Sequence, residues 1–60
     1  MIIELENKTN ARVLRIDLPV IPRIGDYINA EDNDFSEYWL LVEYVVISRS
    51  TIWVTCHEQE

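Results

Sequence analysis

The sequence predicts an all-β protein, either a small five-stranded barrel or a strongly bent antiparallel sheet. Apolar and polar residues alternate along most of the chain, which is the pattern of half-buried strands. The pattern also lacks the apolar spacing of an amphipathic helix. Sixty residues are too few for two stacked sheets of ordinary size. One sheet must therefore bend on itself, which buries one face and removes most of its free edges.

Length and composition predict one folded domain, residues 1–60. Apolar residues make up 48% of the chain, which is ordinary for a globular domain even with a net charge of -6. Cys56 is the only cysteine, so no internal disulfide can form, and we expect a cytoplasmic location. The first residues lack the features of a secretory signal, and no apolar run is long enough to span a membrane.

The first part of the chain contains two strand patterns joined by a turn. Residues 1–6 alternate, and so do residues 11–18. Their inward-facing residues are predicted to be Ile3, Leu5, Leu14, Ile16 and Leu18. The sequence Asn-Lys-Thr-Asn at 7–10 has turn chemistry, because Asn side chains bond to nearby backbone groups and tolerate positive φ.

Residues 18–26, Leu-Pro-Val-Ile-Pro-Arg-Ile-Gly-Asp, interrupt the strand pattern. Pro19 and Pro22 have no backbone N–H, so neither can continue a central ladder. Gly25 is the only glycine, and it suits the third position of a type II turn over residues 23–26, where φ must be positive. We therefore expect an extended crossing segment that ends in a sharp corner, followed by a short strand at residues 26–30.

The second part of the chain is predicted to hold an acidic loop, residues 31–37, and a long hairpin. Residues 38–48 would span about 35 Å if fully extended, whereas a compact chain of this length has a diameter of about 27 Å. The run must therefore bend or overhang. A β-bulge near Glu43 and Tyr44 would explain why both faces look apolar. The inward-facing residues are then Leu40 and Val42 before the bulge, Val45 and Ile47 after it, and Ile52, Val54 and Cys56 on the returning strand.

This order of elements, with the sequence Pro-Arg-Ile-Gly-Asp at residues 22–26, resembles small SH3-like barrels. More narrowly, it resembles short bacterial and phage proteins of unknown function that carry a Pro-Arg-apolar-Gly-Asp/Glu motif before an aromatic-led strand. The resemblance covers about residues 18–57. It implies a fold and carries over no catalytic residue.

Residues that could do chemistry do not form a recognisable catalytic or metal site. Cys56 and His57 are neighbours in a predicted strand, so their side chains point to opposite faces and cannot readily form a thiolate–imidazole pair. Part of a calcium-loop spacing is present in Asp32, Asp34, Ser36 and Glu43. However, Glu37 stands where that motif needs glycine, so only loose cation binding remains as an alternative. We predict that the protein is not an enzyme and has no cofactor and no metal site.

The aromatic residues indicate a binding surface. If the inward set is right, Trp39 and Trp53 point outward on one hairpin, and tryptophan is a favoured anchor at interfaces. Alternatively, one or both close the open end of a barrel as core. Arg23 could clamp a carboxylate of a partner, or it could pair with Asp26 or Glu43. The predicted protein-binding residues are Trp39, Trp53, Tyr38, Tyr44 and Arg23.

We predict a non-enzymatic protein-interaction module that binds another protein or its own copy as a homo-oligomer. The alternative is an acidic inhibitor, encoded by a phage or a bacterium, that blocks a basic nucleic-acid-binding groove. Its phosphate-like carboxylates would be those of Glu31, Asp32, Asp34 and Glu37. Direct nucleic-acid binding is disfavoured by eleven acidic residues against five Lys and Arg. It would have to use Lys8, Arg12, Arg15 and Arg23.

Overall fold

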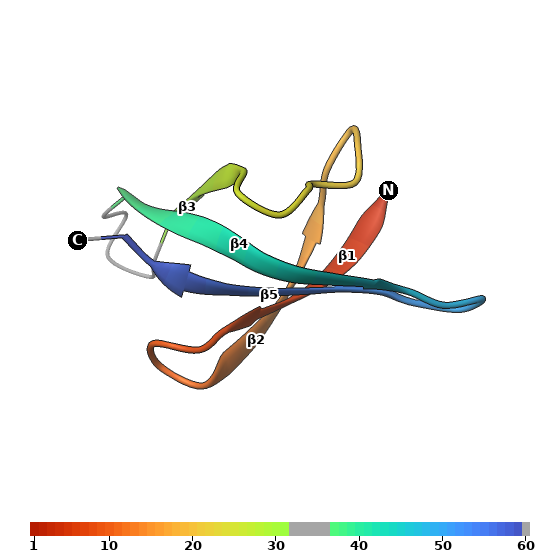
Figure 1. The fold of residues 1–60 in the computed structure, drawn as a ribbon, viewed down its shortest axis with the longest axis horizontal. Helices are drawn as coiled ribbons and strands as arrows, with labels where there is room; N and C mark the ends of the chain where they lie inside the picture. Colours follow the sequence, from red (N-terminus) through yellow and green to blue (C-terminus); the bar gives the residue numbers. More distant parts are fainter. Residues whose placement is uncertain (32–36, 60) are drawn as a thin grey trace.

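The computed structural model describes residues 1–31 and 37–59. These ranges contain no helix and form the five strands shown in Figure 1. The strands are β1 (Ile2–Asn7), β2 (Arg12–Asp17), β3 (Tyr27–Glu31), β4 (Glu37–Ile47) and β5 (Ile52–Glu58). The prediction of an all-β fold is confirmed.

The strands form one sheet in the order β2-β1-β5-β4-β3. Neighbouring strands are antiparallel except β1 and β5, which are parallel. The sheet is therefore mixed, and the prediction of a wholly antiparallel sheet is wrong for this one pair. The parallel pair arises because the crossing segment, residues 18–26, carries the chain from one edge strand to the other, and the last hairpin then returns β5 to the side of β1. Figure 1 shows β1 and β2 crossing the long β4–β5 hairpin at a steep angle.

The sheet curls into a half-barrel whose edge strands are β2 and β3. No ladder joins these two edges within the described part of the chain, so the predicted bend is present without full closure. The arrangement agrees with an SH3-like barrel at the level of a small, curled, five-stranded sheet.

The concave face of the half-barrel holds the core. Its buried apolar residues are Ile3, Leu5, Ile28, Leu40, Val42, Val54 and Cys56, with Ile16, Leu18, Ala30, Tyr38, Val45 and Ile52 packed against them. The predicted inward-facing residues lie in or against this core except for two. Leu14 is half-buried outside the core, and Ile47 is 65% exposed. Ile47 pairs with Ile52 at the end of the β4–β5 hairpin, which extends past the rest of the sheet on the right of Figure 1. The predicted strand therefore both bends and overhangs.

The first turn is organised by asparagine side chains, as predicted. Asn7 Oδ1 accepts the Thr9 N–H at 3.1 Å, and Asn10 Oδ1 accepts the Arg12 N–H at 3.0 Å. The positive φ expected of an asparagine belongs instead to Ala11, at 58°. The asparagines contribute side-chain hydrogen bonds, and the reversal of the chain is completed by the next residue.

The corner at Gly25 also forms as predicted. Gly25 has a φ of 93°, and the Asp26 N–H donates to the Arg23 carbonyl at 2.9 Å, which is the closing bond of the turn. The Arg23 N–H donates to the Asp26 carboxylate at 2.9 Å. Gly25 N–H donates to the Val42 carbonyl, and Val42 N–H donates to the Asp26 carbonyl, both at 2.9 Å. The corner is therefore attached to the middle of β4.

The predicted bulge lies at Glu43. The register between β4 and β5 shifts between Val42 and Tyr44, which leaves Glu43 as the extra residue. Val42 is buried before the bulge, and Val45 packs against the core after it. The bulge thus lets both halves of one strand contribute to the same concave face.

We expect Gly25→Val to lower the free energy of unfolding by about 1–3 kcal/mol, because a β-branched residue is strained at positive φ. A Cβ atom at this position would meet nothing within 4 Å, so the loss would come from the backbone conformation alone. Ser50→Val, in the β4–β5 turn without a positive φ, is the matched control. Thermal melts of the two variants measure the difference, and equal melting temperatures would contradict the account of the corner.

Candidate functional site

The convex side of β3 and β4 carries an apolar surface, here called the aromatic face and formed by the exposed Tyr27 and Trp39 and the half-buried Leu41. Tyr27 lies opposite Leu41 in the ladder, and Trp39 lies opposite Asn29. Tyr27 and Trp39 are therefore diagonal neighbours on the same side of the sheet, within reach of each other. Their side chains are 57% and 52% exposed. The aromatic face therefore lies on two hydrogen-bonded strands.

A second apolar cluster lies on the convex side near the hairpin turn. Val46 lies opposite Trp53, and Trp53 is flanked on its other side by Glu4 of β1. This flanking leaves Trp53 half-buried, whereas Tyr44 and Val46 are exposed. Val46 is seven positions along β4 from Trp39, a separation of about 23 Å. The two tryptophans therefore occupy opposite ends of the hairpin and do not form one patch.

Between these two clusters lies an ionic network centred on the bulge residue. Glu43 Oε2 is 3.1 Å from Lys8 Nζ, and Glu43 Oε1 is 2.7 Å from His57 Nδ1. The hydrogen bond from Lys8 lowers the pKa of the Glu43 carboxyl, and the bond with His57 adds to this effect. The same contact with Glu43 raises the pKa of Lys8. No local sequence pattern indicates this network, because its members meet only through the pairing of three strands.

The environment of Cys56 agrees with the prediction that it does not form a pair with His57. Cys56 is buried on the concave face, and its thiol contacts the Glu6 carbonyl at 3.3 Å. His57 faces the convex side, where it contacts Glu43. Burial raises the pKa of the Cys56 thiol to about 11, so the thiolate is scarce at neutral pH.

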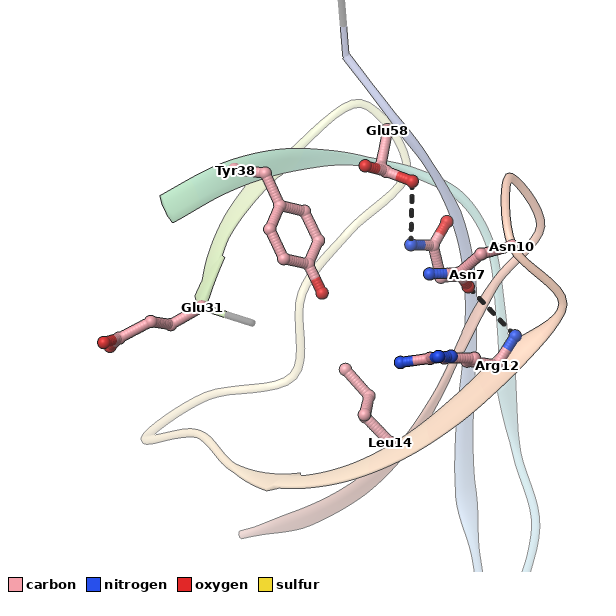
Figure 2. Close-up of a pocket in the computed structure, with 7 residues that line it drawn as sticks. All are labelled: Asn7, Asn10, Arg12, Leu14, Glu31, Tyr38 and Glu58. Carbon is pink, nitrogen blue, oxygen red and sulfur yellow. Dashed lines mark hydrogen bonds between the residues drawn. The ribbon is translucent and has the colours of Figure 1, made fainter. Parts of the chain in front are cut away.

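A polar pocket of about 420 Å3 opens on the concave side, at the end of the half-barrel shown in Figure 2. Its lining residues are Asn7, Asn10, Arg12, Leu14, Glu31, Tyr38 and Glu58. Figure 2 shows Arg12 and Tyr38 pointing into the pocket and the carboxylate of Glu31 pointing away from it. Tyr38, which we predicted to bind a protein partner, is thus half-buried on the opposite side of the sheet from Trp39.

Asn7 lines the pocket, and the prediction that it belongs to the turn is wrong. Asn7 is the last residue of β1 and is fully buried. Its Nδ2 donates to Glu58 Oε2 at 3.4 Å, while its Oδ1 caps the turn at Thr9. The alternation that begins with Ile3 and Leu5 continues inward to Asn7, and this signal was present in the sequence.

Arg23 is exposed at the corner, and within the described ranges its guanidinium forms no ion pair. The expected pairing with Asp26 or Glu43 is therefore not formed there. The Asp26 carboxylate accepts a hydrogen bond from the backbone N–H of Arg23. The Glu43 carboxylate contacts Lys8 and His57.

Two of the four carboxylates predicted for the acidic inhibitor lie within the described ranges. Glu31 and Glu37 lie directly opposite each other at the ends of β3 and β4. Asp32 and Asp34 lie outside the described residues. Among the cations proposed for nucleic-acid binding, Lys8 contacts Glu43, and Arg15 contacts Glu4 at 2.8 Å. These ion pairs neutralise part of the small positive charge that such binding would need.

No family model, curated protein or solved structure matches this chain. Over residues 1–31 and 37–59, no three His, Cys, Asp or Glu side chains are grouped so that they could hold a metal ion. The same ranges contain no helix with the length and apolar character needed to cross a membrane.

We expect Glu43→Gln to lower the melting temperature near pH 7 and to have a smaller effect as the pH falls below about 4.5. The reason is that a carboxyl whose pKa is lowered by folding contributes stability above its unfolded pKa, and this contribution is lost as the pH falls through the folded pKa. Glu37→Gln removes the same charge beside Glu31 and is the control. Melts of both variants from pH 3 to 7 test this, and an effect of Glu43→Gln that is independent of pH would contradict it.

Proposed function

We propose that the protein is a non-enzymatic interaction module that binds another protein, or a second copy of itself, through the aromatic face. The observation that carries this proposal is the diagonal pair of Tyr27 and Trp39, both more than half exposed on one side of the sheet. Aromatic side chains of this kind bury a large area and have a polar group at one end, so they are preferred at interfaces.

The backbone beneath the aromatic face supports a binding role, because it is held in place before any partner arrives. The Gly25 corner hydrogen-bonds to Val42, which fixes the start of β3 against β4. Tyr27 follows this corner directly, and Trp39 lies on the neighbouring strand. A surface on paired strands loses little conformational entropy when it binds, and so more of its contact energy contributes to affinity.

Two features extend the proposal beyond the aromatic face. The cluster of Tyr44, Val46 and Trp53 would form a second contact area, since it lies on the same convex side near the hairpin turn. We also propose that the likeness to SH3-like barrels, and to short bacterial and phage proteins with a similar corner, reflects a shared fold. The coarse shape of the sheet supports this part of the proposal.

We expect Trp39→Ser to weaken association by more than about 1 kcal/mol while leaving the melting temperature nearly unchanged, because the substitution removes an exposed anchor. Val13→Ser is the matched control: Val13 is 50% exposed on β2, at the far edge of the same sheet, and should have no effect on association. Sedimentation equilibrium gives the self-association constant. The same variants in a binding assay test any other protein partner.

The outcomes of this experiment separate binding from folding. If Trp39→Ser unfolds the protein, Trp39 is a structural residue and the proposal is wrong. If Trp39→Ser and Val13→Ser have equal effects on association, the aromatic face is not the binding surface. Trp53→Ser is expected to lower both association and stability, because Trp53 is already half-buried within the protein.

A second candidate function is the acidic inhibitor, and the placement of Glu31 opposite Glu37 favours it. Like charges directly opposite each other destabilise a pair of strands, so this placement concentrates negative charge at a cost in stability. Such a surface would bind a cationic groove in place of nucleic acid.

For the acidic inhibitor, we expect binding to a fluorescent polyarginine peptide that weakens steeply with added salt and is reduced in the double variant Glu31→Gln, Glu37→Gln. Glu4→Gln with Asp17→Asn removes the same charge from β1 and β2 and is the control. Equal losses in the two double variants would show that only net charge matters, which would contradict a specific acidic surface.

A further inference from the structure

We propose that β3 pairs with β3 of a second copy in an antiparallel, two-fold arrangement, so that one sheet runs through both subunits. This inference rests on the proposed function, because it names the partner and the contact beside the aromatic face. It is carried by the free backbone groups of β3, the unequal protection of the two sheet edges and the charges at the two ends of β3.

The hydrogen-bond pattern shows which backbone groups of β3 are free. Val42 N–H donates to the Asp26 carbonyl, so the backbone carbonyl of Asp26 points toward β4. Because the direction of the backbone groups alternates along a strand, the N–H and C=O groups of Ile28 and Ala30 also point toward β4. The N–H and C=O groups of Tyr27, Asn29 and Glu31 consequently lie along the outer edge of β3, where no described strand pairs with them. These groups are the template that an added strand requires.

The other edge of the sheet is better protected against pairing. Leu18 N–H donates to the Met1 carbonyl, so by the same alternation Val13, Arg15 and Asp17 direct their backbone groups to the free edge of β2. Charged side chains on an edge strand oppose pairing with another chain. The six residues of β2 include two arginines and an aspartate, whereas β3 has no proline and no charged residue before Glu31. The β3 edge is therefore the more open of the two.

A two-fold axis at Ile28 gives a consistent register for the pair. Tyr27 then lies opposite Asn29 of the second copy, and each such pair exchanges both of its N–H···O bonds. Glu31 reaches the corner of the second copy, close to its Arg23. Neither Glu31 nor the guanidinium of Arg23 has an ion-pair partner among the described residues. The charges at the two ends of the paired strands are therefore complementary.

The side chains on both faces also fit this register. A hollow of about 370 Å3 lies between the crossing segment and β3, lined by Leu18, Pro19, Val20, Pro22, Asp26, Tyr27, Ile28 and Asn29. Ile28 of the second copy would lie beside Ile28, on the same side of the sheet, and its side chain could enter this hollow. On the convex side, Tyr27 would lie beside Asn29 of the second copy, next to the Trp39 of that copy. The two aromatic faces would thereby become continuous.

The decisive experiment places a proline at each free edge. Asn29→Pro removes an N–H that points away from the sheet, a position at which an edge strand tolerates proline. Val13→Pro makes the same change on the β2 edge and is the matched control. We expect Asn29→Pro to raise the dimer dissociation constant at least tenfold in sedimentation equilibrium, and Val13→Pro to leave it unchanged.

Charge exchange provides a second test that does not depend on proline. Arg23→Glu alone and Glu31→Arg alone should each weaken the dimer, and the double variant should recover most of the affinity of the original protein. Hydrogen exchange of the Tyr27 and Asn29 amides should also slow as the protein concentration rises, while exchange of the Arg15 amide should not. If Asn29→Pro fails to fold, these two measurements decide the question.

The outcomes distinguish this inference from the proposed function. If Trp39→Ser weakens the dimer but Asn29→Pro does not, association uses the aromatic face alone; the edge inference is then overturned and the proposed function stands. If the original protein is a monomer at every accessible concentration, pairing with a second copy is overturned, and the aromatic face remains to be tested against other proteins. Equal effects of Asn29→Pro and Val13→Pro would also overturn the inference.

Discussion

The bulge at Glu43 is the constraint on which the rest of the structure depends. A single sheet of this size can bury only one face, and its longest strand must follow the curve of the half-barrel while it keeps apolar residues inside. The extra residue shifts the alternation of side chains by one position, so that Val45 after the bulge faces the core as Val42 does before it. It also places the Glu43 carboxylate on the convex side, where Lys8 and His57 attach the end of β1 and the strand β5 to the bend.

The buried core lies on the concave face, and within residues 1–31 and 37–59 no second layer covers the convex face. This explains why large apolar side chains are exposed there. Tyr27 and Trp39 lie where the corner at Gly25 fixes β3 against the first half of β4. The same curled, single sheet thus leaves an exposed aromatic surface on the two strands next to the β3 edge. The two features on which the proposed binding role rests follow from building a half-barrel out of one sheet.

Much of the fold could be predicted because the strand pattern is local. Alternation identified the apolar inward residues of β1, β2 and β5, although it missed Asn7, and the single glycine identified the corner. The candidate site was less predictable. Tyr38 and Trp39 are neighbours with similar chemistry, and the strand sends one to the concave pocket and the other to the convex face. Their roles depend on which face is buried.

By itself, the sequence determined the all-β class, the positions of the strands, the positive φ at Gly25 and the location of the bulge, because each of these follows from the spacing of residues close together in the chain. Only the tertiary structure decided the strand order, the parallel pairing of β1 with β5, the position of β3 at an edge and the ion pair between Lys8 and Glu43. These features join residues far apart in the chain. Which strands pair depends on burying one common face of the sheet, and no local pattern specifies that.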